Sequence, residues 1–203
     1  IGWTIGQWVS EVVYAGLTGD FRWLFGLFFG TLYSPLVITG LHHMSNAIDL
    51  QLIADFGGTN LWPMIALSNI AQGSAVLAII FLHRGNEKEE QVSIPAAISC
   101  YLGVTEPAMF GINIKYIYPF VAAMIGSGIA GLVATTFNVM ANSIGVGGIP
   151  GFLSIQTDSM AMFIVCMAIA IVVPFLLTVL FEKKQLFAPK GEVEDAPVIQ
   201  TQK

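Results

Sequence analysis

Long runs without a charged residue alternate with short polar segments along this chain. Uncharged stretches of 26, 28, 42 and 23 residues occupy positions 23–48, 56–83, 116–157 and 159–181. Each is longer than the about 20 residues that a helix needs to cross the hydrocarbon core of a bilayer. Buried helices of soluble proteins seldom run so far without a charge. The pattern therefore predicts an all-α protein that spans a membrane several times.

Proline, glycine and charged residues divide these runs into elements. Membrane spans are expected at about 23–41, 62–82, 117–140 and 160–181. Residues 1–18 carry apolar positions at helical spacing beside polar ones, which predicts an interfacial amphipathic helix. Residues 19–182 are expected to form one membrane domain, followed by a polar tail over 183–203. Lys183 and Lys184 directly follow the last span, which puts this tail in the cytoplasm.

Two segments between the spans do not read as straight membrane helices. Segment 42–60 is polar and contains glycine, so it is either an aqueous loop or a re-entrant piece that lines a cavity. Segment 94–112 is apolar but is interrupted by two prolines and two glycines. For this second segment the sequence predicts a hairpin that enters and leaves the membrane on one side.

Composition agrees with a membrane protein and removes several other classes. Hydrophobic residues make up 55% of the chain and charged residues 10%, far below the roughly 25% charged residues of soluble domains. No basic stripe is present, so we expect no nucleic-acid partner. Cys100 and Cys166 lie in apolar segments without a Cys-x-x-Cys pattern, which indicates packing residues rather than a disulfide or a metal site.

Glu106 in "GVTEPAMFG" (103–111) is the first candidate for chemistry. An ionisable residue inside a membrane segment must be compensated by a partner, water or a ligand, so it indicates a functional site. The adjacent Pro107 breaks the helix and frees backbone groups to face a cavity. Two structural alternatives remain open: Glu106 is paired with Lys115, or it lies in an aqueous loop.

A second candidate is "GLHHMSNAIDLQ" (40–51). If this piece is helical, His42, Asn46 and Asp49 share one face, and His43 points about 100° away. An imidazole, a carboxamide and a carboxylate together suit a polyhydroxylated ligand. A structural polar network and a metal site are the alternatives, and the metal site is the poorer fit because a second well-placed imidazole is missing.

Three further features complete the candidates. Asn113 and Lys115 follow the break at Glu106 and could add polar contacts. Trp62 opens a span, where an aromatic ring either stacks on a sugar or lies at the membrane interface, and we favour the interface. The motif "GSGIAG" (126–131) resembles a dinucleotide-binding loop, but it lies within a span, so its small residues indicate close helix packing and no cofactor.

Three blocks of the chain together carry a family resemblance: "GLHHMSNAIDLQLIADFGGTNLWPMIALSNIAQGSA" (40–75), "SIPAAISCYLGVTEPAMFGINIKYIYPF" (93–120) and "MANSIGVGGIPGFLSIQ" (140–156). They resemble the membrane-embedded EIIC component of bacterial sugar phosphotransferase systems, in the glucose, glucoside and sucrose superfamily. The motif G-[IV]-T-E-P after a G-x-H motif is specific to that superfamily. Within it, the trehalose-specific permeases are the most similar.

The resemblance implies a multi-span helical transporter domain with broken, re-entrant hairpins, in the bacterial cytoplasmic membrane and surrounded by lipid. It implies a homodimer that binds a disaccharide, most simply trehalose, and works with a phosphorylated EIIB domain supplied by EIIA and HPr. The complete EIIBC complex would act as a protein-N(π)-phosphohistidine–sugar phosphotransferase. This chain resembles the C-terminal part of EIIC without EIIB, so by itself we expect neither sugar phosphorylation nor transport.

By the same resemblance, Glu106 would accept hydrogen bonds from sugar hydroxyls and act as a base toward the attacking hydroxyl. His42 would be a second sugar contact, with His43 less favoured, and Thr105 and the backbone freed by Pro107 would add polar groups. Alternatives are a sucrose or other glucoside permease, an ion-coupled secondary transporter, and a sugar sensor that does not transport.

Overall fold

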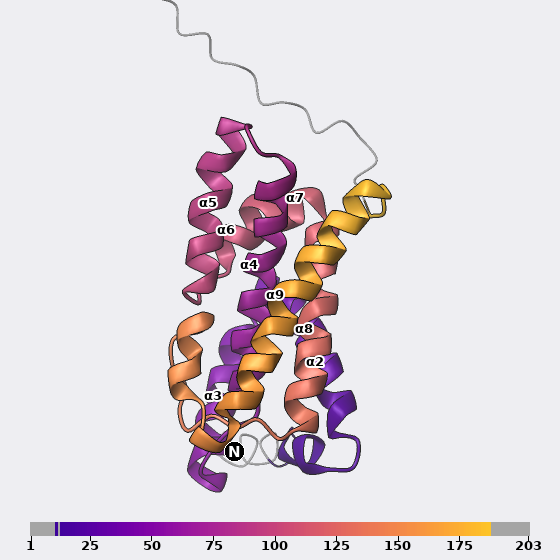
Figure 1. The fold of residues 1–203 in the computed structure, drawn as a ribbon. Coiled ribbons are helices and arrows are strands. Elements are labelled where there is room, and N and C mark those ends of the chain that lie inside the picture. Colours follow the sequence, from indigo (N-terminus) through magenta and orange to yellow (C-terminus); the bar gives the residue numbers. More distant parts are fainter. Residues whose placement is uncertain (1–10, 12, 188–203) are drawn as a thin grey trace, which may run out of the picture.

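The computed structural model describes residue 11 and residues 13–187 (Figure 1). Most of the interfacial helix expected over 1–18 and of the tail expected over 183–203 lies outside these residues. The described chain is helical, and its only extended pairings are isolated bridges that join Thr59 to Ala141 and Ala141 to Ile155. The prediction of an all-α fold is confirmed.

The helices follow one another with short connections. In chain order they are α2 (Arg22–Ile38), α3 (His42–Phe56), α4 (Leu61–Leu82), α5 (Glu87–Tyr101), α6 (Glu106–Ala108), the π-helix η1 (Met109–Asn113), α7 (Ile114–Tyr116), α8 (Tyr118–Thr136), the 3-10 helices η2 (Ile149–Ser154) and η3 (Thr157–Ser159), and α9 (Met160–Lys183).

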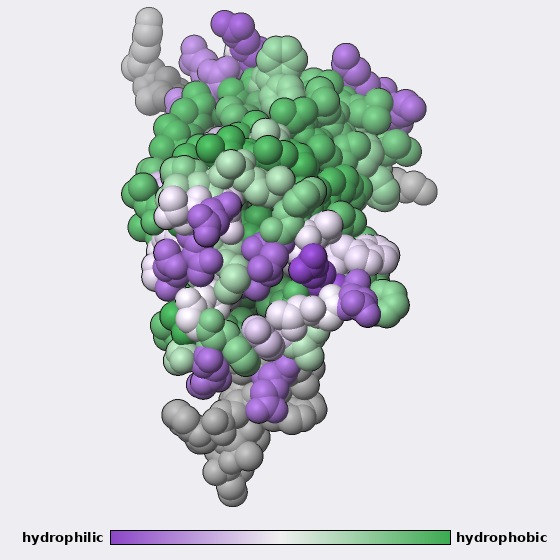
Figure 2. All heavy atoms as spheres, turned by 60° about the horizontal axis from the view of Figure 1, so that its bottom comes forward, coloured by the Kyte–Doolittle hydropathy of each residue, from purple (hydrophilic) through white to green (hydrophobic). Residues whose placement is uncertain are grey.

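Among the residues described, three helical segments are long and apolar enough to cross a membrane: Leu61–Leu82, Tyr118–Thr136 and Thr157–Lys183. Figure 2 shows the matching surface, on which a hydrophobic flank separates hydrophilic side chains at the two ends of the molecule. Lipid-facing surface of this kind is apolar because hydrocarbon offers no hydrogen bonds to polar side chains.

The helices α2 and α3 form a hairpin in the place of the span expected over 23–41 and of segment 42–60, for which the sequence left a loop and a re-entrant piece open. With 17 residues, α2 is shorter than the span expected over 23–41. The chain reverses at Gly40, whose φ of +75° a residue with a side chain rarely adopts. From there α3 returns toward the end of the molecule at which α2 begins (Figure 1).

A second hairpin enters from the opposite end. The helix α5 begins at Glu87 and runs toward the middle of the molecule, and the chain returns through α6, η1 and α7 (Figure 1). The turn between the arms contains Gly103, with φ of +101°. A π-helix on the return arm, directly after Glu106, is a feature that occurs often at functional sites.

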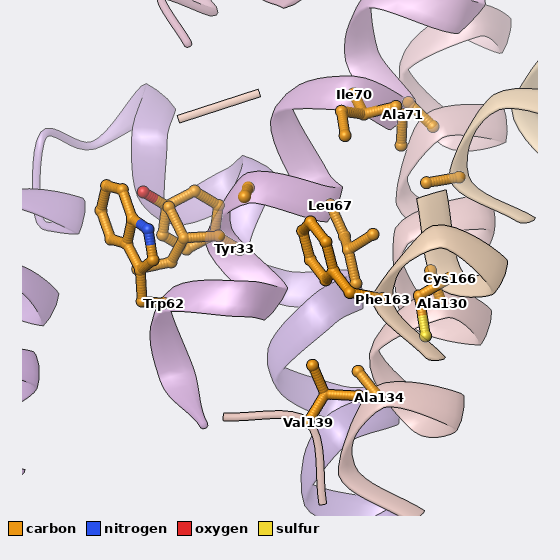
Figure 3. Close-up of a cluster of buried hydrophobic side chains, with 14 of the residues drawn as sticks. Tyr33, Trp62, Leu67, Ile70, Ala71, Ala130, Ala134, Val139, Phe163 and Cys166 are labelled. Atoms are coloured by element: carbon orange, nitrogen blue, oxygen red, sulfur yellow. The ribbon is translucent and has the colours of Figure 1, made fainter. Parts of the chain in front are cut away.

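The core lies around α4, which packs against α2, α5, α8 and α9. Figure 3 shows part of this core, with Leu67, Ile70 and Phe163 buried between the helices. On the other side of the bundle, α2 and α8 approach closely through small residues: a Cβ added at Gly30 would lie 2.5 Å from the Ser127 carbonyl oxygen. This contact confirms that the small residues of 126–131 serve helix packing.

A buried polar network joins both hairpins to α4 near the middle of that helix. The Gln72 side chain donates a hydrogen bond to Ser34 Oγ on α2 (2.8 Å) and accepts one from Asn113 Nδ2 in η1 (2.6 Å). Ser34 Oγ also lies 3.3 Å from Ser68 Oγ. Gln72, Ser34 and Asn113 have no exposed surface, so each depends on the others for hydrogen bonds.

A second polar cluster joins three helices at one end of the bundle. His83 Nδ1 lies 2.7 Å from Glu89 Oε2 on α5, and His83 Nε2 lies 3.1 Å from Glu182 Oε1 on α9. The Tyr118 hydroxyl at the start of α8 donates to Glu182 (3.1 Å), and the Tyr116 ring meets the His83 ring edge-on. An imidazole that faces an acceptor on each nitrogen satisfies both only when it is protonated.

The Gln72 network predicts a specific pattern of stability. The single changes Gln72→Leu and Asn113→Leu should each lower the free energy of unfolding by about 1–2 kcal/mol, because each removes the buried hydrogen bond between the two amide side chains. The double variant should lose less than the sum, because this shared bond is lost only once. A double-mutant cycle from unfolding in detergent measures this coupling. Gln72→Leu combined with Thr31→Val, a hydroxyl bonded within α2, is the control and should be additive.

The His83 cluster predicts a pH dependence. Burial alone lowers the pKa of His83, but hydrogen bonds and charge from Glu89 and Glu182 outweigh burial and hold the pKa above its ordinary value of 6.5. Because the pKa of His83 is raised in the folded protein, protonation of His83 stabilises the fold. This stabilisation is complete below the pKa of the unfolded state and is lost as the pH rises through the pKa of the folded state. Thermal unfolding in detergent between about pH 5 and pH 9 should show this loss. It should be absent in His83→Gln and present in His43→Gln; equal curves for all three proteins would contradict the prediction.

Candidate functional site

The turns of the two hairpins meet inside the molecule. His42 at the start of α3 and Glu106 at the start of α6 are far apart in sequence, yet His42 Nε2 lies 3.9 Å from Glu106 Oε1. The His42 side chain is 14% exposed and the Glu106 side chain 47%. The distance is within ion-pair range but longer than a hydrogen bond, so both groups keep hydrogen-bonding capacity for a ligand.

Backbone contacts fix the position of Glu106. The chain leaves α5 at Tyr101, and the carbonyl oxygen of Gly103 accepts a hydrogen bond from Asn69 Nδ2 on α4 (3.3 Å). A Cβ added at Gly103 would lie 2.7 Å from the backbone nitrogen of Gly147, so the two main chains touch without side chains between them. The glycine-rich segment after α8 therefore supports the turn that carries Glu106.

Aromatic rings surround His42. Its imidazole meets the Tyr33 ring of α2 edge-on, with centroids 6.4 Å apart. The His43 ring lies 4.0 Å from the His42 ring, and the His43 side chain is exposed. His42, rather than His43, therefore faces Glu106. The imidazole nitrogen Nδ1 of His42 is buried and has no hydrogen-bond partner.

Asn46 and Asp49 lie further along α3. Asn46 is half-buried, whereas Asp49 is fully buried and accepts a hydrogen bond from the Thr59 hydroxyl (2.6 Å). Thr59 Oγ1 in turn accepts a hydrogen bond from the Leu61 backbone N–H at the start of α4 (3.0 Å). Asp49 thus stabilises the turn between α3 and α4 and orders the helix that bears His42.

The remaining predicted residues separate into two groups. Thr105 is buried and Pro107 is exposed, and both adjoin Glu106 at the turn. Asn113 and Lys115 are not brought to this turn: Asn113 bonds Gln72, and the Lys115 ammonium lies 5.0 Å from the Tyr116 ring centroid. Among the described residues the recorded ion-pair partner of Glu106 is His42, not Lys115.

The placement of Trp62 corrects an expectation. We favoured the membrane interface for this side chain, but only 6% of it is exposed, and it belongs to the buried cluster shown in Figure 3. The helix α4 is surrounded by other helices from its first turn, so Trp62 packs inside the protein.

Sequence reasoning missed Asn69, Gln72 and Tyr33. Asn69 and Gln72 could have been identified from the sequence, because they are amides within an uncharged stretch. Polar side chains at membrane depth generally face the protein interior. Within the part of the chain that the structure describes, no group of three or more His, Cys, Asp or Glu residues is placed to hold a metal ion.

Comparisons with known proteins identify the family. The family described as "Phosphotransferase system, EIIC" matches residues 1–127. The trehalose-specific EIIBC component of Escherichia coli (strain K12) is 56% identical over 177 residues, 87% of this chain and 37% of the relative. The corresponding component of Bacillus subtilis (strain 168) is 50% identical over 82% of this chain and 36% of the relative.

A sucrose-specific EIIBC component of Pasteurella multocida (strain Pm70) is 44% identical over 89% of this chain and 39% of the relative. The chain thus spans less than half the length of these relatives. No solved structure matches it. The family match covers more than half of the chain and agrees with the three helices of membrane-spanning length. The chain belongs to the EIIC family of the phosphotransferase system, as an integral protein of the bacterial cytoplasmic membrane.

Proposed function

We propose that this chain is the sugar-binding part of a phosphotransferase permease and that His42 and Glu106 hold the sugar. The observation that carries this proposal is the meeting of the two side chains, 3.9 Å apart, at the turns of hairpins that enter from opposite ends. A half-exposed carboxylate and a half-buried imidazole, at a place where both helices are interrupted, supply acceptors and a donor to sugar hydroxyls.

Glu106 also suits the chemical step. The attacking sugar hydroxyl forms a bond to the phosphorus atom of an EIIB phosphocysteine, the S–P bond breaks, and the hydroxyl proton passes to the Glu106 carboxylate. Such transfers depend mainly on positioning and charge stabilisation, with modest help from a base. The contacts of Gly103 with Asn69 and Gly147 supply that positioning.

The other predicted residues have supporting roles in this proposal. Thr105 and the backbone freed by Pro107 line the turn beside the carboxylate. Asn46 lies one helical turn beyond His42 and reaches the sugar from α3, while His43 packs against His42 and limits its rotation. In this proposal Asn113 and Lys115 do not contact the sugar.

Trehalose is the proposed substrate. Two relatives at 56% and 50% identity are named as trehalose-specific components. Sucrose is the second candidate, because a relative named as sucrose-specific is 44% identical over a similar share of the chain. Both sugars are disaccharides with a glucosyl unit, so one carboxylate and one imidazole suit either.

The phosphorylated EIIB domain is the proposed phosphate donor, with EIIA and HPr upstream and a second permease copy completing a homodimer. Of the six basic residues that are described, five lie at one end of the bundle: Arg84, Lys88, Lys115, Lys183 and Lys184. By the positive-inside tendency this end faces the cytoplasm. The EIIB domain then approaches along α5, whose arm leads to Glu106.

The change Glu106→Gln tests the proposal in the full-length permease that carries this sequence. The amide keeps the size of the side chain but loses the charge and the base, so trehalose uptake should fall by 100-fold or more, on the order of the contribution of a general base. Binding of radiolabelled trehalose to the detergent-solubilised protein should weaken as well. Membrane insertion should be unchanged.

Asp158→Asn is the matched control, because Asp158 is exposed in η3, away from the proposed path of EIIB along α5. That variant should transport normally. Uptake and trehalose binding by Glu106→Gln at the level of the control would show that Glu106 is not part of the sugar site. Preferential binding of sucrose over trehalose by the unmodified protein would transfer the proposal to the second substrate.

A further inference from the structure

The indole of Trp62 is a buried hydrogen-bond donor with no acceptor. Only 6% of the residue is exposed, and its Nε1 atom has no partner in the structure. Indole nitrogen only donates, so Trp62 has no second polar atom to compensate. An unpaired buried donor is costly, and native structures rarely keep one without a reason.

This unpaired donor lies beside the site. Trp62 and Tyr33 belong to one buried cluster, and Figure 3 shows their rings next to each other. The Tyr33 ring also meets the rings of Phe29 and His42, and the Nδ1 atom of His42 is buried and unpaired like the indole nitrogen. Two unpaired nitrogen atoms thus belong to side chains that adjoin Tyr33.

No acceptor lies within hydrogen-bond distance of the indole nitrogen. A Cβ built at Gly145 would lie 4.0 Å from Trp62 Nε1 and would overlap the Ser154 hydroxyl, so both the glycine-rich segment and Ser154 pass near the indole without bonding to it. Seven residues along α4, on the same face of the helix, Asn69 holds the turn that carries Glu106. The indole is therefore one aromatic ring, Tyr33, away from His42, and it lies on the face of α4 that also carries Asn69.

We propose that the Trp62 indole N–H donates a hydrogen bond to a hydroxyl oxygen of the bound sugar and so helps to select the substrate. This inference rests on the proposed function, because it places the same sugar between His42 and Glu106. A site that hydrogen-bonds a hydroxyl rejects an analogue that lacks it, since the protein donor is then left unpaired. Trp62 is therefore a specificity-determining residue of this site.

Other unpaired groups do not fit this role. The hydroxyls of Ser93 and Thr178 are also buried without partners, but they lie in the halves of α5 and α9 nearer the opposite end. Asp49, Glu89 and Asn113 each lack a partner for one oxygen only, because the other polar atom of the side chain bonds Thr59, His83 or Gln72.

The test removes the N–H group and keeps the ring. In the full-length permease, Trp62→β-(3-benzothienyl)alanine replaces N–H by sulfur at nearly constant shape, and Trp62→Phe is the simpler genetic variant. Trehalose should bind the benzothienyl variant about threefold to tenfold more weakly, the value of one neutral hydrogen bond. Sugar-free thermal stability should be equal or higher, because an unpaired donor has been removed. Trp23→Phe, on the exposed surface of α2, is the control and should bind normally.

Deoxytrehaloses supply a second measurement, made on the unmodified protein and on the benzothienyl variant. One of the 2-, 3-, 4- or 6-deoxy sugars should bind the unmodified protein more weakly than trehalose does. The benzothienyl variant should bind that deoxy sugar at least as tightly as it binds trehalose. If the variant binds every sugar as the unmodified protein does, the role of Trp62 is overturned while the sugar site stands. If the unmodified protein binds no disaccharide, the proposed function fails, and this inference with it.

Discussion

Every polar group of this protein that lies within the hydrocarbon layer needs a hydrogen-bond partner from the protein itself. The Gln72 side chain on α4 meets this requirement for α2 and for η1 as well as for its own helix. Its side chain uses donor and acceptor ends in different directions, toward Ser34 on the first hairpin and Asn113 on the second. Re-entrant hairpins cannot be held by lipid, because lipid tails are as apolar as the residues that face them. Directional bonds from a central helix give each hairpin a defined depth.

That depth brings His42 and Glu106 together. Each hairpin by itself would expose a broken helix end with unpaired backbone groups. Where the two turns face each other, His42 and Glu106 come within 3.9 Å, and Asn69 and Gly147 support the turn of the second hairpin. The chemistry of the site and the stability of the hairpins therefore depend on the same arrangement.

The sequence allowed the helical class, the helices α4, α8 and α9, and the polar breaks to be predicted, because hydropathy and helix breakers act over short distances. Glu106 and His42 stood out as polar residues in apolar surroundings. Their meeting could not be predicted from hydropathy or spacing, since it depends on how two segments 64 positions apart are packed, and only the family resemblance placed both at one sugar site. The same limit explains two differences from the sequence-based expectations. The Asn113 side chain bonds Gln72 instead of lying at the Glu106 turn. Trp62 is buried in the protein, although its apolar neighbours in sequence are equally compatible with a lipid-facing position.

The contact between Gly103 and Gly147 has a consequence for redesign. Because main chain meets main chain there, the turn that carries Glu106 is positioned by two glycine backbones and the Asn69 amide rather than by bulky side chains. Side chains of α2 and α3 around His42 can then be exchanged without displacing this turn. The two hairpins become separately adjustable parts of one scaffold.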